Sequence, residues 1–132
     1  MKKLFALCII MVLSYSCTKD KEEPLYEKCI SHEQAYIISA NVPINGSVNQ
    51  TIPINISFSV YNGCGSFENF TETNSVNTKT IKVNAIYEGC ICTQAIETIQ
   101  TTYNFTPTTT GMHTLNFSQP NGDVLTYTID IQ

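Results

Sequence analysis

The chain has 132 residues, a length that suits one small domain, and a formal net charge of −4 at pH 7. Its basic residues are all lysines, so it lacks both the basic footprint of nucleic-acid-binding proteins and the guanidinium fork that recognises phosphates. Threonine, asparagine, isoleucine and tyrosine are abundant and tryptophan is absent, a composition that favours strands and turns over helices.

The N-terminal segment predicts export and lipid attachment. Lys2 and Lys3 precede an apolar run of about ten residues, which is too short for a membrane-spanning helix of about 20 residues but has the proportions of a signal-peptide core. The small residue Ser16 then precedes Cys17, which resembles the lipobox of bacterial lipoproteins. The resemblance implies a signal peptide over residues 1–16 and a diacylglyceryl group on Cys17, which makes the membrane a partner of the chain. The alternative is an ordinary secretory signal with a chance cysteine.

A polar tether is expected between the lipidated cysteine and the folded domain, over residues 17–33. The charged stretch 19–23 is similar to the lysine-plus-acidic sequence that follows the cysteine in many Bacteroidetes-type lipoproteins and marks them for the outer face of the outer membrane. That resemblance implies a lipid-anchored location in the bacterial cell envelope, at the outer membrane and on the cell surface. The alternative is a solvated tether without a sorting role. Near the end of the tether, Cys29 to Glu33 is expected to form a short turn.

From Gln34 onward the sequence predicts strands and turns. The clearest strand runs from Thr51 to Tyr61, where large apolar residues alternate with polar or small ones, so that one face is buried and the other is wet. Further strands are expected at residues 35–42, 78–88, 95–105, 112–117 and 124–131. An Asn-Gly turn at Gln119 to Gly122 predicts a hairpin between the last two.

A polar segment from Ser66 to Asn77 interrupts this pattern and is expected to be a loop. It contains Phe67 and Phe70 and lies shortly after Tyr61. Because the loops of a rigid sandwich often carry its binding function, Tyr61, Phe67 and Phe70 are the candidate binding residues. The alternative is that the two phenylalanines cap the open end of the sandwich.

The chain has six cysteines, of which one leaves with the signal peptide and Cys17 is lipidated. The even number that remains in an exported chain predicts disulfides, for which three pairings exist. Cys90 and Cys92 are too close in sequence for an unstrained bridge, so each is expected to have a distant partner. We prefer Cys29–Cys90 with Cys64–Cys92; the swapped pairing is the alternative.

The segment Tyr103-Asn104-Phe105-Thr106-Pro107, followed by Gly111 to Phe117, resembles an element that leads into the penultimate strand of bacterial immunoglobulin-like domains. Asn62-Gly63-Cys64-Gly65 is similar to a feature of small Bacteroidetes lipoproteins with such domains. The resemblance implies an all-β fold, an immunoglobulin-like antiparallel β-sandwich of six to seven strands, over residues 34–132. It implies a fold and no particular activity.

No catalytic or cofactor motif stands out. Gly-x-Ser-x-Gly and His-Glu-x-x-His are absent, and the cysteines lack the paired spacing of a zinc site. His113 is expected to be a hydrogen-bonded residue at the margin of the core. We therefore expect a non-catalytic lipoprotein without a cofactor that binds a protein or a glycan, and no nucleic acid, through its end loops. The alternatives are a periplasm-facing accessory or inhibitor of an envelope complex and, last, a small hydrolase that uses carboxylates such as Glu68 and Glu72.

Overall fold

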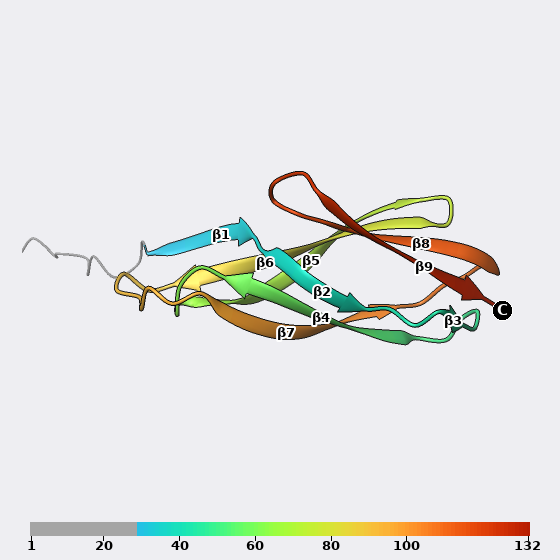
Figure 1. Cartoon of the computed structure of the whole chain (residues 1–132), viewed down its shortest axis with the longest axis horizontal. Coiled ribbons are helices and arrows are strands. Elements are labelled where there is room, and N and C mark those ends of the chain that lie inside the picture. Colours follow the sequence, from blue (N-terminus) through green and yellow to red (C-terminus); the bar gives the residue numbers. More distant parts are fainter. Residues whose placement is uncertain (1–28) are drawn as a thin grey trace, which may run out of the picture.

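Residues 29–132 are described by a computed structural model, and the predicted signal peptide, Cys17 and most of the tether lie outside the described residues. The described chain consists of strands and their connections, and Figure 1 shows an elongated body built from them. The strands are β1 (Ile30–Gln34), β2 (Tyr36–Asn41), β3 (Asn45–Gly46), β4 (Ile52–Val60), β5 (Gly65–Ser75), β6 (Thr78–Glu88), β7 (Glu97–Phe105), β8 (Gly111–Ser118) and β9 (Val124–Ile131).

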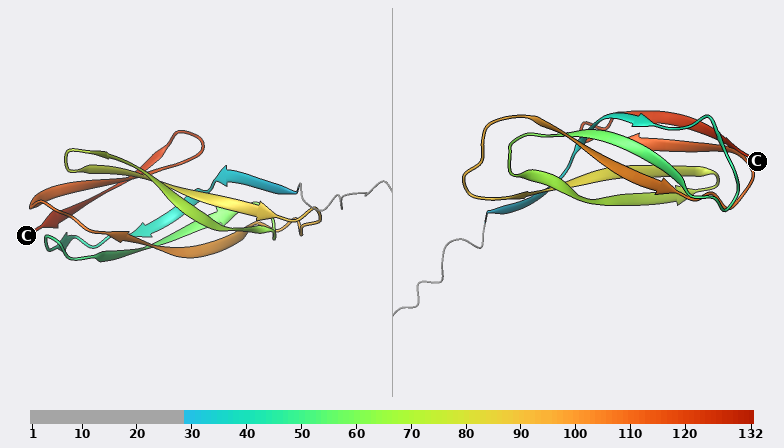
Figure 2. Two further views of the ribbon diagram at one scale, coloured as in Figure 1. Left: turned by 180° about the vertical axis from the view of Figure 1, so that it is seen from behind. Right: turned by 90° about the horizontal axis from the view of Figure 1, so that it is seen from below.

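The strands form two sheets, which confirms the predicted all-β sandwich. A six-stranded sheet has the order β1-β6-β8-β9-β3, with β5 also paired to β6, and a three-stranded sheet has the order β2-β4-β7. Figure 2 shows the two layers from behind and from below. Pairing is antiparallel except between β6 and β8 and between β3 and β9, which are parallel.

One long strand organises the larger sheet. The beginning of β6, at Thr78 to Ile81, pairs with β8, and its end, at Asn84 to Glu88, pairs with β1. Strands β1 and β8 therefore share one side of β6, while β5 follows its other side. Between β1 and β2 the chain crosses to the smaller sheet at Ala35, whose N–H donates to the Val83 carbonyl at 2.8 Å.

The core lies between the sheets and follows the predicted alternation. In β4 every second residue from Ile52 to Val60 is buried, and in β6 the same holds from Ile81 to Tyr87. β8 and β9 add further buried aliphatic and aromatic side chains: Leu115, Phe117, Ile129 and Ile131. Fully burying one such side chain contributes about 1.5–3 kcal/mol, so this layer supplies most of the driving force for folding.

Two segments differ from the sequence-based expectation. The expected turn at Cys29 to Glu33 is mostly strand β1, so the sheet begins before the expected domain start at residue 34. The expected loop from Ser66 to Asn77 is mostly strand β5, which pairs with β6 along its length. Phe67 and Phe70 are three residues apart, which breaks a period of two. A bulge between Phe67 and Asn69 takes up the extra residue, so both rings face the core.

Gln119, directly after β8, joins the two sheets. Its side chain is 4% exposed, and its Oε1 accepts from the Ile37 N–H at 2.8 Å while its Nε2 donates to the Ile37 carbonyl at 2.7 Å. β2 lies at an edge of the smaller sheet, so this amide satisfies backbone groups there that face no neighbouring strand. The hairpin that follows has Gly122 at φ +92° and confirms the predicted Asn-Gly turn.

We predict that Gln119→Leu lowers the free energy of unfolding by about 2–4 kcal/mol, because it leaves a buried N–H and a buried carbonyl of Ile37 unpaired. Gln100→Leu, on the exposed face of β7, is the matched control and should change stability by less than about 0.5 kcal/mol. Urea denaturation of both variants measures the difference. Equal stability of the two variants would contradict the proposed role of the Gln119 amide.

Candidate functional site

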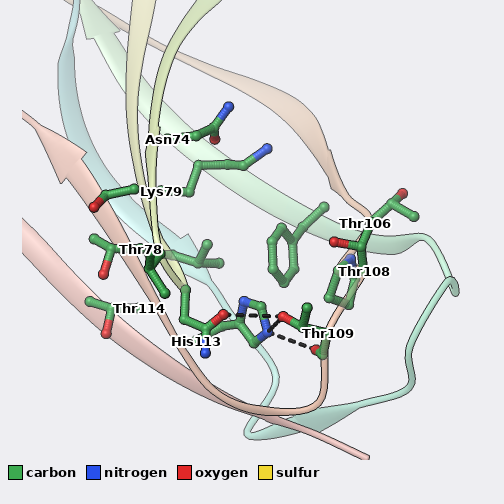
Figure 3. A pocket seen from close by; sticks show the side chains of 14 residues that line it. Asn74, Thr78, Lys79, Thr106, Thr108, Thr109, His113 and Thr114 are labelled. Atoms are coloured by element: carbon green, nitrogen blue, oxygen red, sulfur yellow. Dashed lines mark hydrogen bonds between the residues drawn. The ribbon is translucent and has the colours of Figure 1, made fainter.

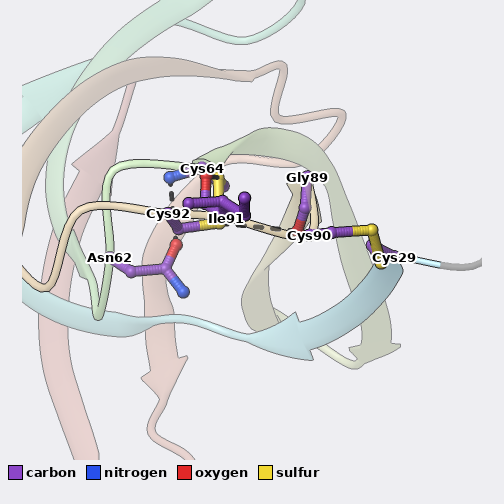
Figure 4. Close-up of a disulfide and its surroundings, with 7 residues drawn as sticks. All are labelled: Cys29, Asn62, Cys64, Gly89, Cys90, Ile91 and Cys92. Atoms are coloured by element: carbon purple, nitrogen blue, oxygen red, sulfur yellow. Dashed lines mark hydrogen bonds between the residues drawn. A yellow bond between two sulfur atoms is a disulfide. The ribbon is translucent and has the colours of Figure 1, made fainter. Parts of the chain in front are cut away.

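Two disulfides close the end of the sandwich at which the described chain begins. They join Cys29 to Cys90 and Cys64 to Cys92, which confirms the preferred pairing and excludes the swapped one (Figure 4). Cys64 lies in the β4–β5 connection and Cys92 in the β6–β7 connection, so one bridge ties together two crossings between the sheets. The other bridge holds the residue just before β1.

Backbone contacts pack this disulfide end closely. The Gly89 N–H donates to the Cys29 carbonyl at 2.9 Å, and the Glu88 N–H donates to the Cys64 carbonyl at 3.2 Å. Gly89 has φ +145°, and a Cβ there would lie 2.8 Å from the Cys64 Sγ. Glycine is therefore required at this position by both its backbone conformation and the neighbouring sulfur atom.

Tyr61 is the exposed member of the predicted binding set. Its side chain is 46% exposed, its ring stacks on Tyr87 with centroids 4.0 Å apart, and its Oη donates to Glu33 at 3.3 Å. A shallow hollow of about 250 Å³ lies beside it, with Tyr36 and Ile96 in its wall. Burial raises the pKa of Tyr87, which forms the inner layer of this aromatic pair.

Phe67 and Phe70 lie on strand β5 and face inward. Their centroids are 4.8 Å apart, Phe67 lies 6.2 Å from Phe58, and Phe70 meets Tyr103 edge-on at 5.1 Å. Both rings are partly buried against the core cluster. The structure therefore separates the three predicted residues: Tyr61 is on the surface, whereas the two phenylalanines extend the core.

A second pocket lies at the other end of the sandwich. It has a volume of about 440 Å³ and forms between the β5–β6 turn and the β7–β8 connection. Figure 3 shows Asn74 and Lys79 on one side, Thr106, Thr108 and Thr109 on the other, and His113 at the base. Figure 1 places the β7–β8 connection near the C-terminus, at the end of the body away from the start of β1.

His113 is 7% exposed and is held at the base of this end pocket. Its Nε2 donates to the Thr109 carbonyl at 2.8 Å, and its ring meets Phe105 edge-on at 5.8 Å. The prediction of a hydrogen-bonded histidine at the core margin is thus confirmed. A carbonyl oxygen only accepts hydrogen bonds, so Nε2 carries the proton and Nδ1 of the neutral ring is an acceptor.

The ammonium group of Lys79 lies at the pocket wall and forms an ion pair with Glu72. Its Nζ lies 2.8 Å from Glu72 and 6.0 Å from the ring centroids of both Tyr103 and Phe105. Partial burial raises the pKa of Glu72, but the hydrogen bond and charge of Lys79 outweigh it, so the pKa lies below its ordinary value of 4.5. The positive charge of Lys79 is therefore largely neutralised within the protein.

Tyr103 lies beneath this ion pair. Its Oη is buried and has no hydrogen-bond partner among the described residues. Burial, and after it the nearby Glu72 carboxylate, raise the pKa of Tyr103 far above its usual range. The phenol therefore remains neutral at all physiological pH values.

Sequence reasoning missed this end pocket because its walls come from two turns about thirty residues apart, at Val76 to Thr78 and Thr106 to Thr109. Within residues 29–132 no three His, Cys, Asp or Glu side chains form a group that could hold a metal ion. In the same part of the chain, no helix is long and apolar enough to cross a membrane.

We predict that removing the Cys64–Cys92 bridge by Cys64→Ala with Cys92→Ala lowers the free energy of unfolding by about 3 kcal/mol, because the unfolded chain loses a closed loop. The sequence separation is 28 for this bridge and 61 for Cys29–Cys90, so the corresponding Cys29→Ala/Cys90→Ala variant should lose somewhat more. Urea denaturation measures both losses. Free thiols at any of the four positions in the native protein would contradict the pairing.

We predict that Glu72→Gln reduces the loss of stability in acid. The pKa of Glu72 is lowered on folding, so its contribution is present above about pH 4.5 and is lost as the pH falls through the folded value. Glu97→Gln serves as the control on the same sandwich. Thermal unfolding between about pH 2 and pH 7 should show a flatter acid limb for Glu72→Gln, and parallel curves for both variants would refute the proposed linkage.

The comparisons with known proteins agree with this fold. No curated protein and no solved structure matches the chain significantly. A family model described as the ORF11 beta-sandwich domain matches residues 54–131, from Ile54 near the start of β4 to the end of β9. This match covers more than half of the chain, and the chain therefore belongs to the ORF11 beta-sandwich domain family.

Proposed function

We propose that this protein is a non-catalytic interaction module, anchored to the bacterial outer membrane through lipidated Cys17 and displayed on the cell surface. The anchor rests on the signal-like segment 1–16 and the lipobox-like cysteine, which precede the described domain. A lipidated cysteine that carries several acyl chains gives stable attachment where a single chain is marginal.

The observation that carries the proposal is the position of the end pocket relative to the start of the domain. β6 runs from the pocket, at Thr78, to the disulfide end, at Glu88. At about 3.3 Å per residue, the strand separates the two ends by roughly 35 Å. An anchor on the N-terminal side would hold the disulfide end toward the membrane and leave the pocket directed away from it, where a protein or glycan partner has access.

The chemistry of the described residues favours binding over catalysis. The Lys79 ammonium is engaged by Glu72, and the proton-bearing nitrogen of His113 is engaged by the Thr109 carbonyl. A general acid needs a proton that it can deliver to a substrate in reach, and these two donors are already engaged within the protein. The groups that line the end pocket are mostly hydroxyls and amides, which suit recognition through hydrogen bonds.

We predict that Cys17→Ser transfers the protein from the membrane fraction to the aqueous phase of a detergent partition, because the variant has no thiol to acylate. Lys21→Ser, a substitution in the tether, is the control and should remain in the detergent phase. Mass spectrometry of the N-terminal peptide should find acyl chains on the wild type and none on the variant. A wild-type protein in the aqueous phase would refute the anchor.

Protease added to intact cells tests the surface display separately. Cleavage of the domain, with an internal periplasmic marker left intact, is the expected result. Protection of the domain would overturn surface display and favour an accessory role on the periplasmic side.

A further inference from the structure

We propose that the end pocket binds a neutral oligosaccharide, an inference that rests on the proposed function and assigns its ligand. The pocket has a volume of about 440 Å³, within the range of small-molecule sites. Its polar lining consists mainly of uncharged hydroxyl and amide groups: Asn74, Asn77, Thr78, Thr106, Thr108 and Thr114. Such groups both donate and accept hydrogen bonds, as the hydroxyls of a sugar do.

The pocket also has the apolar surface that a sugar ring requires. Val76 contributes to its lining and is 90% exposed, and the methyl groups of the lining threonines lie around it, while Phe105, Pro107 and Leu115 form the buried layer behind them. The faces of pyranose rings carry C–H groups that pack on apolar surfaces, while their edges carry the hydroxyls. A pocket that combines an exposed valine and threonine methyl groups with hydroxyl and amide groups matches that arrangement.

The charge of the end pocket argues against an anionic ligand. Lys79 is the only cationic side chain in the lining, and its Nζ already lies 2.8 Å from the Glu72 carboxylate. An anionic ligand would have to displace the Glu72 carboxylate from Lys79 or share Lys79 with that carboxylate. A neutral ligand leaves this ion pair intact.

His113 supplies an acceptor nitrogen at the base of the pocket. The residue is 7% exposed, its Nε2 is bonded to Thr109, and no described residue hydrogen-bonds to its Nδ1. Figure 3 shows the second ring nitrogen on the side of the pocket toward Lys79. A sugar hydroxyl that donates to Nδ1 would satisfy this nitrogen.

The two turns that form the pocket are fixed to one another before any ligand arrives. Thr109 Oγ1 donates to Asn77 Oδ1 at 3.1 Å, and the Thr114 N–H donates to the Asn77 carbonyl at 2.8 Å. The Asn49 N–H donates to the Pro107 carbonyl at 2.8 Å on the opposite flank. Such preorganisation lowers the entropic cost of binding.

The test uses the full-length protein in detergent and a panel of neutral oligosaccharides, namely oligomers of glucose, mannose and N-acetylglucosamine, measured by calorimetry. Polygalacturonate and heparin are the anionic comparison. We expect at least one neutral oligomer to bind with a dissociation constant of about 1 mM or lower. Asn74→Ala combined with Thr108→Ala should weaken that binding about tenfold, because two exposed hydrogen-bonding groups are lost.

The matched control is Asn55→Ala combined with Thr102→Ala, which removes the same residue types from the outer face of the smaller sheet. It should leave binding unchanged. All four substituted residues are exposed, so thermal unfolding should show both double variants folded. Binding that survives the pocket variant, binding of anionic polymers alone, or no binding of any neutral oligomer at about 10 mM would each overturn the proposal.

A photo-crosslinking residue placed at Ser75, in the wall of the end pocket, shows whether the pocket contacts a protein. It therefore distinguishes a wrong assignment of the ligand from a wrong proposed function. Reproducible capture of one protein on intact cells, without glycan binding, would replace the glycan by a protein partner and leave the interaction module in place. Neither glycan binding nor capture would overturn both proposals.

Discussion

The structure depends on one apolar layer, the side chains that alternate strands bury between the two sheets. In β4 and β6, the facing residues from Ile52 to Val60 and from Ile81 to Tyr87 are at most 7% exposed. Because the side-chain period of a strand is two, a slip of one residue in either strand would turn this whole set toward water. Register is therefore fixed by the layer, and the positions of the turns at both ends of the sandwich follow from that register.

That layer also explains which elements the sequence predicts. Strand β4 and most of β6 are evident because a strict apolar alternation is visible in the residues themselves. β5 is not, because Phe67 and Phe70 are out of phase and only the bulge beside Glu68 brings both rings inward. Strand β1 is not predicted for a different reason. Its residues are largely exposed and show no apolar alternation, and it is a strand because it pairs with β6.

The two ends of the sandwich are stabilised by different means. At the disulfide end, Cys90 and Cys92 point to separate partners, so a three-residue segment is tied to the start of β1 and to the β4–β5 connection. The cysteine count and the short spacing predict that Cys90 and Cys92 have separate distant partners, but they leave open which partner each one takes. At the other end, Asn77, Thr109 and His113 form a hydrogen-bonded network across two turns. No local pattern predicts it, since its members meet only after β6 and β8 have paired in parallel.

The end pocket and the core are physically continuous, and this bears on how binding would act on the domain. Lys79 and Glu72 form an ion pair at the pocket wall, and the lysine lies over the rings of Tyr103 and Phe105, whose side chains are buried. A cation held over aromatic faces is stabilised most where water is excluded. A ligand that fills the pocket would remove water from this cluster and strengthen it. Binding at the turns would then stabilise the sandwich itself, by an amount that grows with the logarithm of ligand concentration above the dissociation constant.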